Sequence, residues 1–392
     1  MNFKRLLAGL LSLVLFLSIN PFAFAEDIED DDIDFSDYEI EDSSLDLSDD
    51  AANDSVVYKG TVDFPPFSMY TGEVLYTGKV VIKGGCSIRA EMDMDSKRLK
   101  TIPLYATIEI LDVYADWLRI RYDGVEGYGK RLWMYARPEA VDPVNTPPYG
   151  VYRYNYVATC KEDTPIQLAP GPLTAPVQTK AGPEQNAYLV LSPGAKISII
   201  DVYDGWGRFF YWHTYGYVDM SKLTDLIDVS PTDDGMGKDV PIAAYTSYYT
   251  LVKNDLNDGR IKNIYRANDL ITRVYAPGEF FDFNKQVGPY NKRNGYFLAP
   301  VLVEGGTKEG YGGGTCQVSS TMFNVLLQLP GITVEHRRAH QQSGARYLPI
   351  GNDAAVGTGE LNLQFRSNYD FPIRMEATAQ DGALTMVMYR AD

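Results

Sequence analysis

The chain has 392 residues, of which 45% are hydrophobic, 12% aromatic and 22% charged, a composition typical of a globular protein with two or three domains. Its formal net charge is −16, and no part of the chain is basic enough to suggest nucleic-acid binding. The negative charge is concentrated in residues 26–54, which hold fifteen acidic and no basic residues, so the rest of the chain is close to neutral.

The first 25 residues have the pattern of a secretory signal peptide. Lys4 and Arg5 precede an apolar stretch over residues 6–19, and residues 23–25 (Ala-Phe-Ala) form a small-x-small cleavage pattern. The acidic residues 26–56 hold too few large apolar side chains to offset the entropy of ordering, so we expect a solvated spacer. No other apolar run approaches the roughly 18 residues that span a bilayer. We therefore expect an exported protein, secreted or at the cell wall, with no integral membrane span after cleavage.

Residues 57–140 and 149–228 resemble each other. Each has Asp-Val-Tyr, a tryptophan and a closing Gly-Tyr; the landmarks are Asp112, Trp117 and Gly127 in the first copy and Asp201, Trp206 and Gly216 in the second. Alternation over residues 108–113 and 118–122 predicts two half-buried strands joined at Asp123-Gly124. We expect a small β-barrel for each copy. Both are similar to bacterial SH3-like (SH3b) domains, a resemblance that implies cell-wall peptide binding or a spacer role.

The three cysteines separate into a pair and a remainder. Cys86 and Cys160 occupy equivalent places near the first strand of each copy, which favours a structural role as buried thiols or as one mutual disulfide. An odd number of cysteines in an exported protein leaves at least one thiol free. Cys316 has no counterpart in the repeat and is therefore the candidate for a reactive thiol.

The remaining residues, 243–392, form one domain after a linker over residues 229–242 that is rich in Asp, Gly, Pro and Ser. Apolar spacing predicts a helix over residues 260–274. Alternation predicts strands over residues 361–365, 373–379 and 383–389, the last two joined at Asp381-Gly382. Helices early and strands late indicate an α+β domain. We therefore expect a multidomain, mostly β protein in which two small SH3-like β-barrels precede an α+β domain.

The sequence YGGGTCQVSS, residues 311–320, places Cys316 at the start of a helix. The helix is predicted from Thr315 by one apolar stripe made of Val318, Met322, Val325, Leu326 and Leu329, and Pro330-Gly331 ends it. A thiol in the first turn lies at the positive end of the helix dipole, which stabilises the thiolate. The glycines, Gly313 and Gly314 among them, allow a substrate carbonyl to approach, and backbone N–H groups there can stabilise an oxyanion. Burial of Cys316 as an ordinary core residue is the alternative.

A cysteine nucleophile needs a base, and two of the three histidines of the chain, His336 and His340, follow Cys316 in the same domain. Either imidazole can take the thiol proton and return it to a leaving amine. The alternative for each is a structural hydrogen bond at the domain surface. One cysteine and two histidines lack the paired spacing of a zinc site, so we predict neither a metal nor another cofactor.

Four stretches of this domain resemble the VanW family: YAPGEFFDFNKQVGPYNKRNGYFLAPVLVEGG, YGGGTCQVSSTMFNVLLQLPGITVEHRRAH, YLPIGNDAAV and LQFRSNYDFPI. The resemblance implies L,D-transpeptidation of peptidoglycan with Cys316 as the nucleophile. His340 fits the second of two family histidines and Arg338 stands where the first would be, so we favour His340 as the base. Arg338 is then placed to hold a substrate carboxylate. Gln317, Ser319 and Ser320 match the family pattern and either position the substrate or cap the helix.

The function expected from these residues is that of a secreted L,D-transpeptidase with an α+β catalytic domain. Its partners would be peptidoglycan stem peptides and no nucleic acid. A wall-binding protein that recognises stem peptides without chemistry is one alternative, and a cysteine peptidase that cleaves the same peptides is another. The oligomeric state and the pairing of Cys86 with Cys160 stay open.

Overall fold

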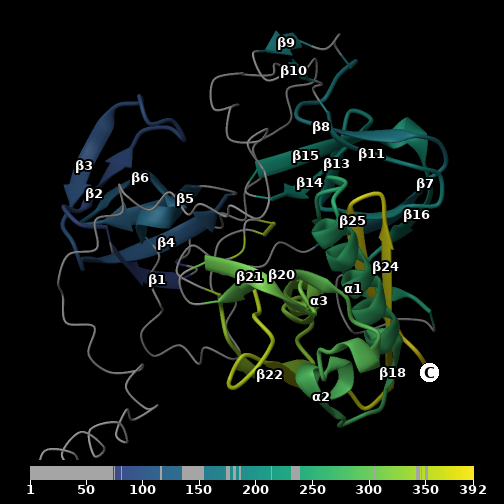
Figure 1. The fold of residues 1–392 in the computed structure, drawn as a ribbon. Coiled ribbons are helices and arrows are strands. Elements are labelled where there is room, and N and C mark those ends of the chain that lie inside the picture. Colours follow the sequence, from purple (N-terminus) through teal and green to yellow (C-terminus); the bar gives the residue numbers. More distant parts are fainter. Residues whose placement is uncertain are drawn as a thin grey trace, which may run out of the picture. The chain divides into compact units, whose positions relative to one another are not determined.

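The computed structural model describes residues 74, 76–80, 82–114, 117–134, 154–173, 177–179, 182–184, 187–212, 214–230, 239–303, 306–340, 345, 347–348 and 352–392 (Figure 1). The predicted signal peptide, the acidic spacer and most of the predicted linker lie outside these residues. Within the described part of the chain, no helix is long and apolar enough to cross a membrane.

The first β-module, residues 74–134, is a six-stranded antiparallel sheet. Its elements are β1 (Tyr76–Lys79), β2 (Cys86–Arg89), β3 (Arg98–Ile102), β4 (Thr107–Val113), β5 (Trp117–Tyr122), β6 (Val125–Lys130) and the 3-10 helix η2 (Arg131–Met134). The strand order is β1-β4-β5-β6-β2-β3. The predicted strands are confirmed, and the turn between β5 and β6 has φ of 48° at Asp123 and 74° at Gly124, as a two-residue hairpin turn requires. The structure thus confirms a small β-module, while its SH3-like identity stays a prediction.

The second β-module, residues 154–230, contains three small antiparallel sheets. Its strands are β7 (Tyr156–Cys160), β8 (Thr164–Gln167), β9 (Val177–Thr179), β10 (Gly182–Glu184), β11 (Ala187–Leu191), β12 (Lys196–Ile199), β13 (Asp201–Tyr203), β14 (Trp206–Tyr211), β15 (Thr214–Asp219) and β16 (Leu223–Asp228), with the 3-10 helix η3 (Met220–Lys222) before β16. The sheet orders are β11-β8-β15-β14-β13, β12-β7-β16 and β10-β9. Cys86 and Cys160 are buried free thiols, so they form no disulfide in this structure.

The C-terminal domain, residues 239–392, mixes helices and strands as predicted. Its elements are β17 (Pro241–Tyr248), α1 (Asp255–Ile271), β18 (Arg273–Tyr275), β19 (Phe280–Asp282), α2 (Phe283–Val287), η4 (Lys292–Asn294), β20 (Leu298–Val303), β21 (Gly306–Tyr311), α3 (Thr315–Leu326), β22 (Ile332–Arg337), β23 (Leu363–Ser367), β24 (Ile373–Gln380) and β25 (Ala383–Arg390). The sheets are β17-β25-β24-β18, β19-β23-β22 and β20-β21. The first strand, β17, begins inside the predicted linker and pairs with the last strand, so the domain is closed by its two ends.

The helix α1 was predicted in the right place but with the wrong ends. It begins at Asp255, five residues before the predicted start at residue 260, and the side chain of Asn254 caps its N-terminus by accepting from the Asn257 N–H. Gly259 lies inside the helix. A Cβ at this position would stand 2.0 Å from the carbonyl oxygen of Leu298, so glycine is what allows α1 to approach β20 closely. Val274, assigned to the helix by its spacing, lies in β18. Figure 1 shows α1 alongside β24.

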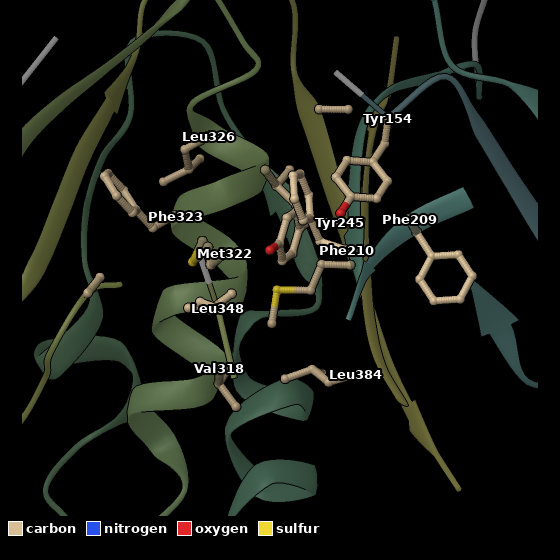
Figure 2. Close-up of a cluster of buried hydrophobic side chains, with 14 of the residues drawn as sticks. Tyr154, Phe209, Phe210, Tyr245, Val318, Met322, Phe323, Leu326, Leu348 and Leu384 are labelled. Carbon is tan, nitrogen blue, oxygen red and sulfur yellow. The ribbon is translucent and has the colours of Figure 1, made fainter. Parts of the chain in front are cut away.

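The core of the C-terminal domain continues into the second β-module. The hydroxyl of Thr246 in β17 accepts from the Ser198 N–H at 2.9 Å, and the Tyr154 N–H donates to the side chain of Gln328 at 3.1 Å. Figure 2 shows Tyr154 and Tyr245 beside the apolar side chains of α3. Helix α3, which carries Cys316, is in turn bonded to β17 through the hydroxyls of Thr321 and Ser247, 2.7 Å apart.

Candidate active site

The glycine run before Cys316 is a packed turn. Gly314 precedes α3 with φ of 103°, in the left-handed region that side chains rarely adopt. Gly313 is buried, and a Cβ there would lie 2.2 Å from the carbonyl oxygen of Pro300 in β20. We expected the glycines to leave the backbone open to substrate. The space where their side chains would be is instead filled by neighbouring protein atoms. The glycines let the chain turn from β21 into α3 while it lies directly against its neighbours.

Cys316 lies in the first turn of α3, as the apolar stripe predicted, and its side chain is half-buried. The sulfur lies 3.4 Å from the carbonyl oxygen and 3.5 Å from the nitrogen of Val356, 40 residues later in the chain. The backbone N–H of Val356 can donate to a thiolate. Among the described residues, the N–H of Cys316 itself has no hydrogen-bond acceptor, whereas those of Thr315 and Gln317 donate to Gly312 and Gly314.

The structure brings His340 to Cys316 and adds a residue that the sequence reasoning missed, Asp353. The imidazole of His340 is close enough to the thiol of Cys316 for each group to shift the pKa of the other. Its Nδ1 lies 2.6 Å from Oδ2 of Asp353, so Nδ1–H donates to the carboxylate and Nε2 is the nitrogen left for the sulfur. Asp353 is fully buried. A thiol, an imidazole and a buried carboxylate in this order form a nucleophile, a base and the group that orients the base.

The ionisation of these three groups is coupled. Burial alone would raise the pKa of Cys316, but the hydrogen bond and positive charge of His340 bring it below the ordinary value of a thiol. Burial alone would lower the pKa of His340, but the neighbouring carboxylate of Asp353 and the sulfur raise it to about 10. Burial likewise opposes the ionisation of Asp353, yet its pKa is lowered because His340 and Arg337 lie beside it. All three shifts favour a thiolate next to an imidazolium over a neutral thiol next to a neutral imidazole.

The other two thiols behave in the opposite way. Burial raises the pKa of Cys86 to about 12, and burial also raises that of Cys160. Cys316 is thus the thiol that the fold prepares for nucleophilic chemistry, whereas the pair in the β-modules has the properties of ordinary core residues.

Arg337 holds the carboxylate from the other side. Its Nε donates to the backbone carbonyl of Asp353 at 2.7 Å and its Nη2 lies 3.5 Å from Oδ1 of the same residue. The guanidinium also stacks on the ring of Phe323 in α3, at 5.0 Å from the ring centre. The arginine thereby connects the end of β22, the segment of Asp353 and helix α3.

Ser319 and Ser320 tie residues 352–356, the segment that carries Asp353 and Val356, to α3. The Ser319 hydroxyl donates to the Ala354 carbonyl at 2.6 Å, and Ser320 Oγ accepts from the Ala354 N–H at 2.9 Å. These hydroxyls were predicted to position substrate or cap the helix. Their observed contacts are instead internal, and they set the distance between the thiol and the segment facing it.

Gln317 is also bonded within the domain. Its amide donates to the Ser247 hydroxyl and to the Tyr248 carbonyl, each at 3.0 Å, and its oxygen accepts from Arg260 at 2.6 Å. This side chain, predicted to contact substrate or cap, joins α3 to β17 and α1 behind the thiol. A polar residue next to the nucleophile thus acts by fixing the helix that carries it.

His336 and Arg338 lie away from the thiol. His336 is on β22 and its Nε2 lies 2.7 Å from the carbonyl oxygen of Glu360. Arg338 is exposed and forms an ion pair with the Glu360 side chain. The structure therefore groups His340, and not His336, with Cys316. Arg338 already has a carboxylate partner from the protein itself.

Residues that the sequence reasoning did not assign also surround the thiol. The ring of Tyr290 lies against Gly312. Burial raises the pKa of Tyr290, and the nearby Cys316 raises it further. The pKa of Tyr347 is raised by burial and by the same thiol. The stretch YLPIGNDAAV contains both Tyr347 and Asp353, and a carboxylate among small and apolar residues was the available signal for a buried acid. Within the described residues, no group of three or more His, Cys, Asp or Glu side chains is placed to hold a metal ion.

One of the comparisons with known proteins falls on this same domain. The family model described as VanW like protein matches residues 259–389. The protein named "Uncharacterized protein YoaR" of Bacillus subtilis (strain 168) is 36% identical over 152 residues, which are 38% of this chain and 48% of that protein. The chain thus spans about half the length of this relative.

Two solved structures from Trichomonas vaginalis also match. NlpC2 is 10% identical and matches 50% of this chain and 56% of its own; NlpC1 is 9% identical and matches 86% and 97%. Both have a TM-score of 0.14, which is too low to indicate a shared fold. The family match, together with the relative from Bacillus subtilis, confirms the resemblance seen in the sequence: residues 259–389 form a VanW-like domain.

Proposed function

We propose that this protein is an exported L,D-transpeptidase that forms 3-3 crosslinks between the stem peptides of peptidoglycan. The observation that carries the proposal is the hydrogen bond of the His340 ring to the buried carboxylate of Asp353, with the imidazole near enough to Cys316 to lower the pKa of the thiol. Acyl-transfer enzymes use this arrangement to hold a thiolate ready at neutral pH. The resemblance to the VanW family, which implies peptidoglycan chemistry, supports the choice of substrate.

In the first half-reaction the Cys316 thiolate attacks the carbonyl carbon of the peptide bond that joins the diamino acid of a stem tetrapeptide to its terminal D-amino acid. A C–S bond forms and the carbonyl oxygen becomes an oxyanion. When this intermediate collapses, the C–N bond breaks and the His340 imidazolium gives its proton to the leaving nitrogen. The terminal D-amino acid departs as an amine, and the shortened stem remains on Cys316 as a thioester.

The oxyanion needs a hydrogen-bond donor close to the sulfur. The N–H of Cys316 has no acceptor among the described residues and lies at the positive end of α3, so it is the donor that we assign to this role. This differs in detail from the sequence-based expectation, which named the backbone N–H groups at Gly313 and Gly314. The Gln317 N–H is already used by Gly314.

In the second half-reaction the side-chain amine of another stem attacks the thioester. His340, now neutral, accepts the proton of the attacking amine while the C–S bond breaks and the thiolate re-forms. Asp353 keeps the imidazole in the tautomer that this step requires, because its carboxylate accepts from Nδ1–H. The product is an amide between two diamino-acid residues.

Purified protein incubated with disaccharide-tetrapeptide tests the proposal by product mass spectrometry. We expect a crosslinked dimer together with free D-amino acid from the unaltered chain, and neither from Cys316→Ala. Cys86→Ala is the matched control, because it removes a thiol whose pKa is raised by burial. Tripeptide without dimer would identify the peptidase alternative, and saturable binding without any product would identify the binding-protein alternative.

A further inference from the structure

A shallow hollow of about 520 Å³ is lined by Asn291, Lys292, Arg293 and Tyr311. Its volume is in the range of pockets that hold small ligands. Tyr311 is the last residue of β21, five positions before Cys316 along the glycine turn. On the opposite side, Tyr290 precedes the lining loop directly and its ring lies against Gly312. The hollow therefore adjoins the segment that delivers the nucleophile.

The lining carries two positive charges that the protein does not neutralise. Lys292 and Arg293 are exposed, and neither forms an ion pair with any acidic residue that the structure describes. This contrasts with Arg338, the cation predicted to hold a substrate carboxylate, which is paired with Glu360. An adjacent lysine and arginine without an internal partner are suited to a carboxylate, since Arg can bind it through two parallel hydrogen bonds.

The loop that presents these two cations is held in place. The Asn291 side chain accepts from the Asn294 N–H at 3.1 Å, and the Asn294 side chain donates to the Pro289 carbonyl at 3.0 Å. Arg266 in α1 donates to the Asn294 carbonyl at 3.1 Å. A loop bonded to itself and to a helix loses little freedom when a ligand binds, which favours recognition over transient contact.

We propose that this hollow binds a carboxylate of the peptide whose carbonyl carbon is attacked by Cys316. The proposal rests on the proposed function, and it assigns to Lys292 and Arg293 the substrate-binding role expected of Arg338. A stem tetrapeptide has two sources of this chemistry near the reacting bond, namely the C-terminal carboxylate of the leaving residue and a side-chain carboxylate of the diamino acid. The Tyr311 hydroxyl at the rim can add a hydrogen bond to either.

Binding to the full chain carrying Cys316→Ala tests the proposal without turnover. The probes are a synthetic tetrapeptide with both carboxylates free, its C-terminal amide, and its side-chain amide. We expect Lys292→Gln with Arg293→Gln to weaken binding of the free acid about 10-fold, as the loss of charge-assisted hydrogen bonds in a partly solvated site predicts. One of the two amides should bind weakly whether or not Lys292 and Arg293 are present. The carboxylate that is blocked in this amide is the one that the hollow binds.

The matched control is Lys97→Gln with Arg98→Gln, an adjacent and exposed Lys-Arg pair in the first β-module. This control should leave the affinity for all three probes unchanged. The proposal would be overturned if the two double variants bound the free acid with equal affinity. It would also be overturned if the chain that keeps Lys292 and Arg293 bound the free acid and both amides equally well.

Alkylation of Cys316 at pH 7 shows whether the double variant has lost only the carboxylate site or has also damaged the site around the thiol. We expect Lys292→Gln with Arg293→Gln to be alkylated at the rate of the unaltered chain, because neither cation touches the thiol, imidazole or carboxylate of the site. Selective loss of peptide affinity with unchanged alkylation supports the proposal. Charge-dependent binding by Cys316→Ala, combined with no thioester in the chain that keeps Cys316, would refute the transpeptidase function and leave the carboxylate site standing.

Discussion

His340 and Asp353 are joined twice through a single oxygen atom: the imidazole Nδ1 and the backbone nitrogen of His340 each lie 2.6 Å from Oδ2 of Asp353. The carboxylate therefore fixes both the position of the backbone and the direction of the ring. Because Asp353 is fully buried, its charge acts on the imidazole with little screening by water. The contact makes the basicity of His340, and hence the ionisation of Cys316, depend on one residue.

Asp353→Asn should abolish most thiolate formation at neutral pH. The amide keeps the size of the side chain but removes the negative charge that stabilises the imidazolium, so the pKa of Cys316 should rise. The alkylation rate at pH 6 is then expected to fall about 10-fold for each unit by which that pKa rises. Asp282→Asn is the control, since Asp282 is also a shielded carboxylate with a lowered pKa but lies on β19 and α2. Equal alkylation profiles for the two variants would contradict the role of Asp353.

The pH dependence of alkylation should differ from that of a free cysteine. In the unaltered chain the pKa of Cys316 is lowered and that of His340 is raised to about 10, so the rise in alkylation rate should come at a lower pH than for an ordinary thiol. His340→Gln should move the rise in rate to alkaline pH, because burial then acts on the thiolate without a cation beside it. The measurement is the rate of carboxamidomethylation of Cys316 by peptide mass spectrometry between pH 5 and 10.

Stability should respond to pH in the direction set by the same histidine. The folded-state pKa of His340 lies above its unfolded value, so its contribution is fully present below about 6.5 and is lost as pH rises through about 10. The difference in denaturant midpoint between the unaltered chain and His340→Gln should therefore narrow as the pH is raised from 8 to 10.5. A difference that stays constant over this interval would show that the folded imidazole is already neutral at pH 8.

Arg337→Gln should reduce turnover with little effect on substrate affinity. The arginine acts through Asp353, to which it donates at the backbone carbonyl and beside which it lies at 3.5 Å from Oδ1. Loss of this positioning should lower kcat about 10-fold while KM stays close to that of the unaltered chain. A second readout is the alkylation profile, which should shift to higher pH; a merely destabilised protein would lower kcat and leave that profile in place. Arg366→Gln, in the exposed pair with Glu335, is the matched control.

The local features of the site could be predicted from the sequence, and the long-range ones could not. The apolar stripe of α3 indicated both the start of the helix and the place of Cys316 in its first turn. The hairpin at Asp381-Gly382 was confirmed as well, with φ of 50° and 84°. Such signals depend on residues that are near one another in the chain.

Asp353 illustrates what the sequence left undecided. It meets His340 across thirteen residues, part of them outside the described structure, and no spacing rule connects a buried acid to an imidazole at that separation. The same applies to the pairing of β17 with β25, which depends on the closure of the whole domain. The roles of Ser319 and Ser320 were open for a related reason, since a hydroxyl can face substrate or backbone and only the fold selects the partner.

The glycine turn offers a test of how the fold places the nucleophile. Gly313→Ala adds a Cβ that would lie 2.2 Å from the Pro300 carbonyl oxygen, so the turn must move and carry Cys316 with it. We expect a loss of about 1–3 kcal/mol of unfolding free energy, as overpacking usually costs, together with slower alkylation of Cys316. Gly278→Ala is the control, because its φ of 73° strains the backbone but nothing lies within 4 Å of the added Cβ. It should lose comparable stability without changing alkylation. Normal alkylation in Gly313→Ala would show that the turn is open to side chains and therefore to substrate, as the glycine run alone had suggested.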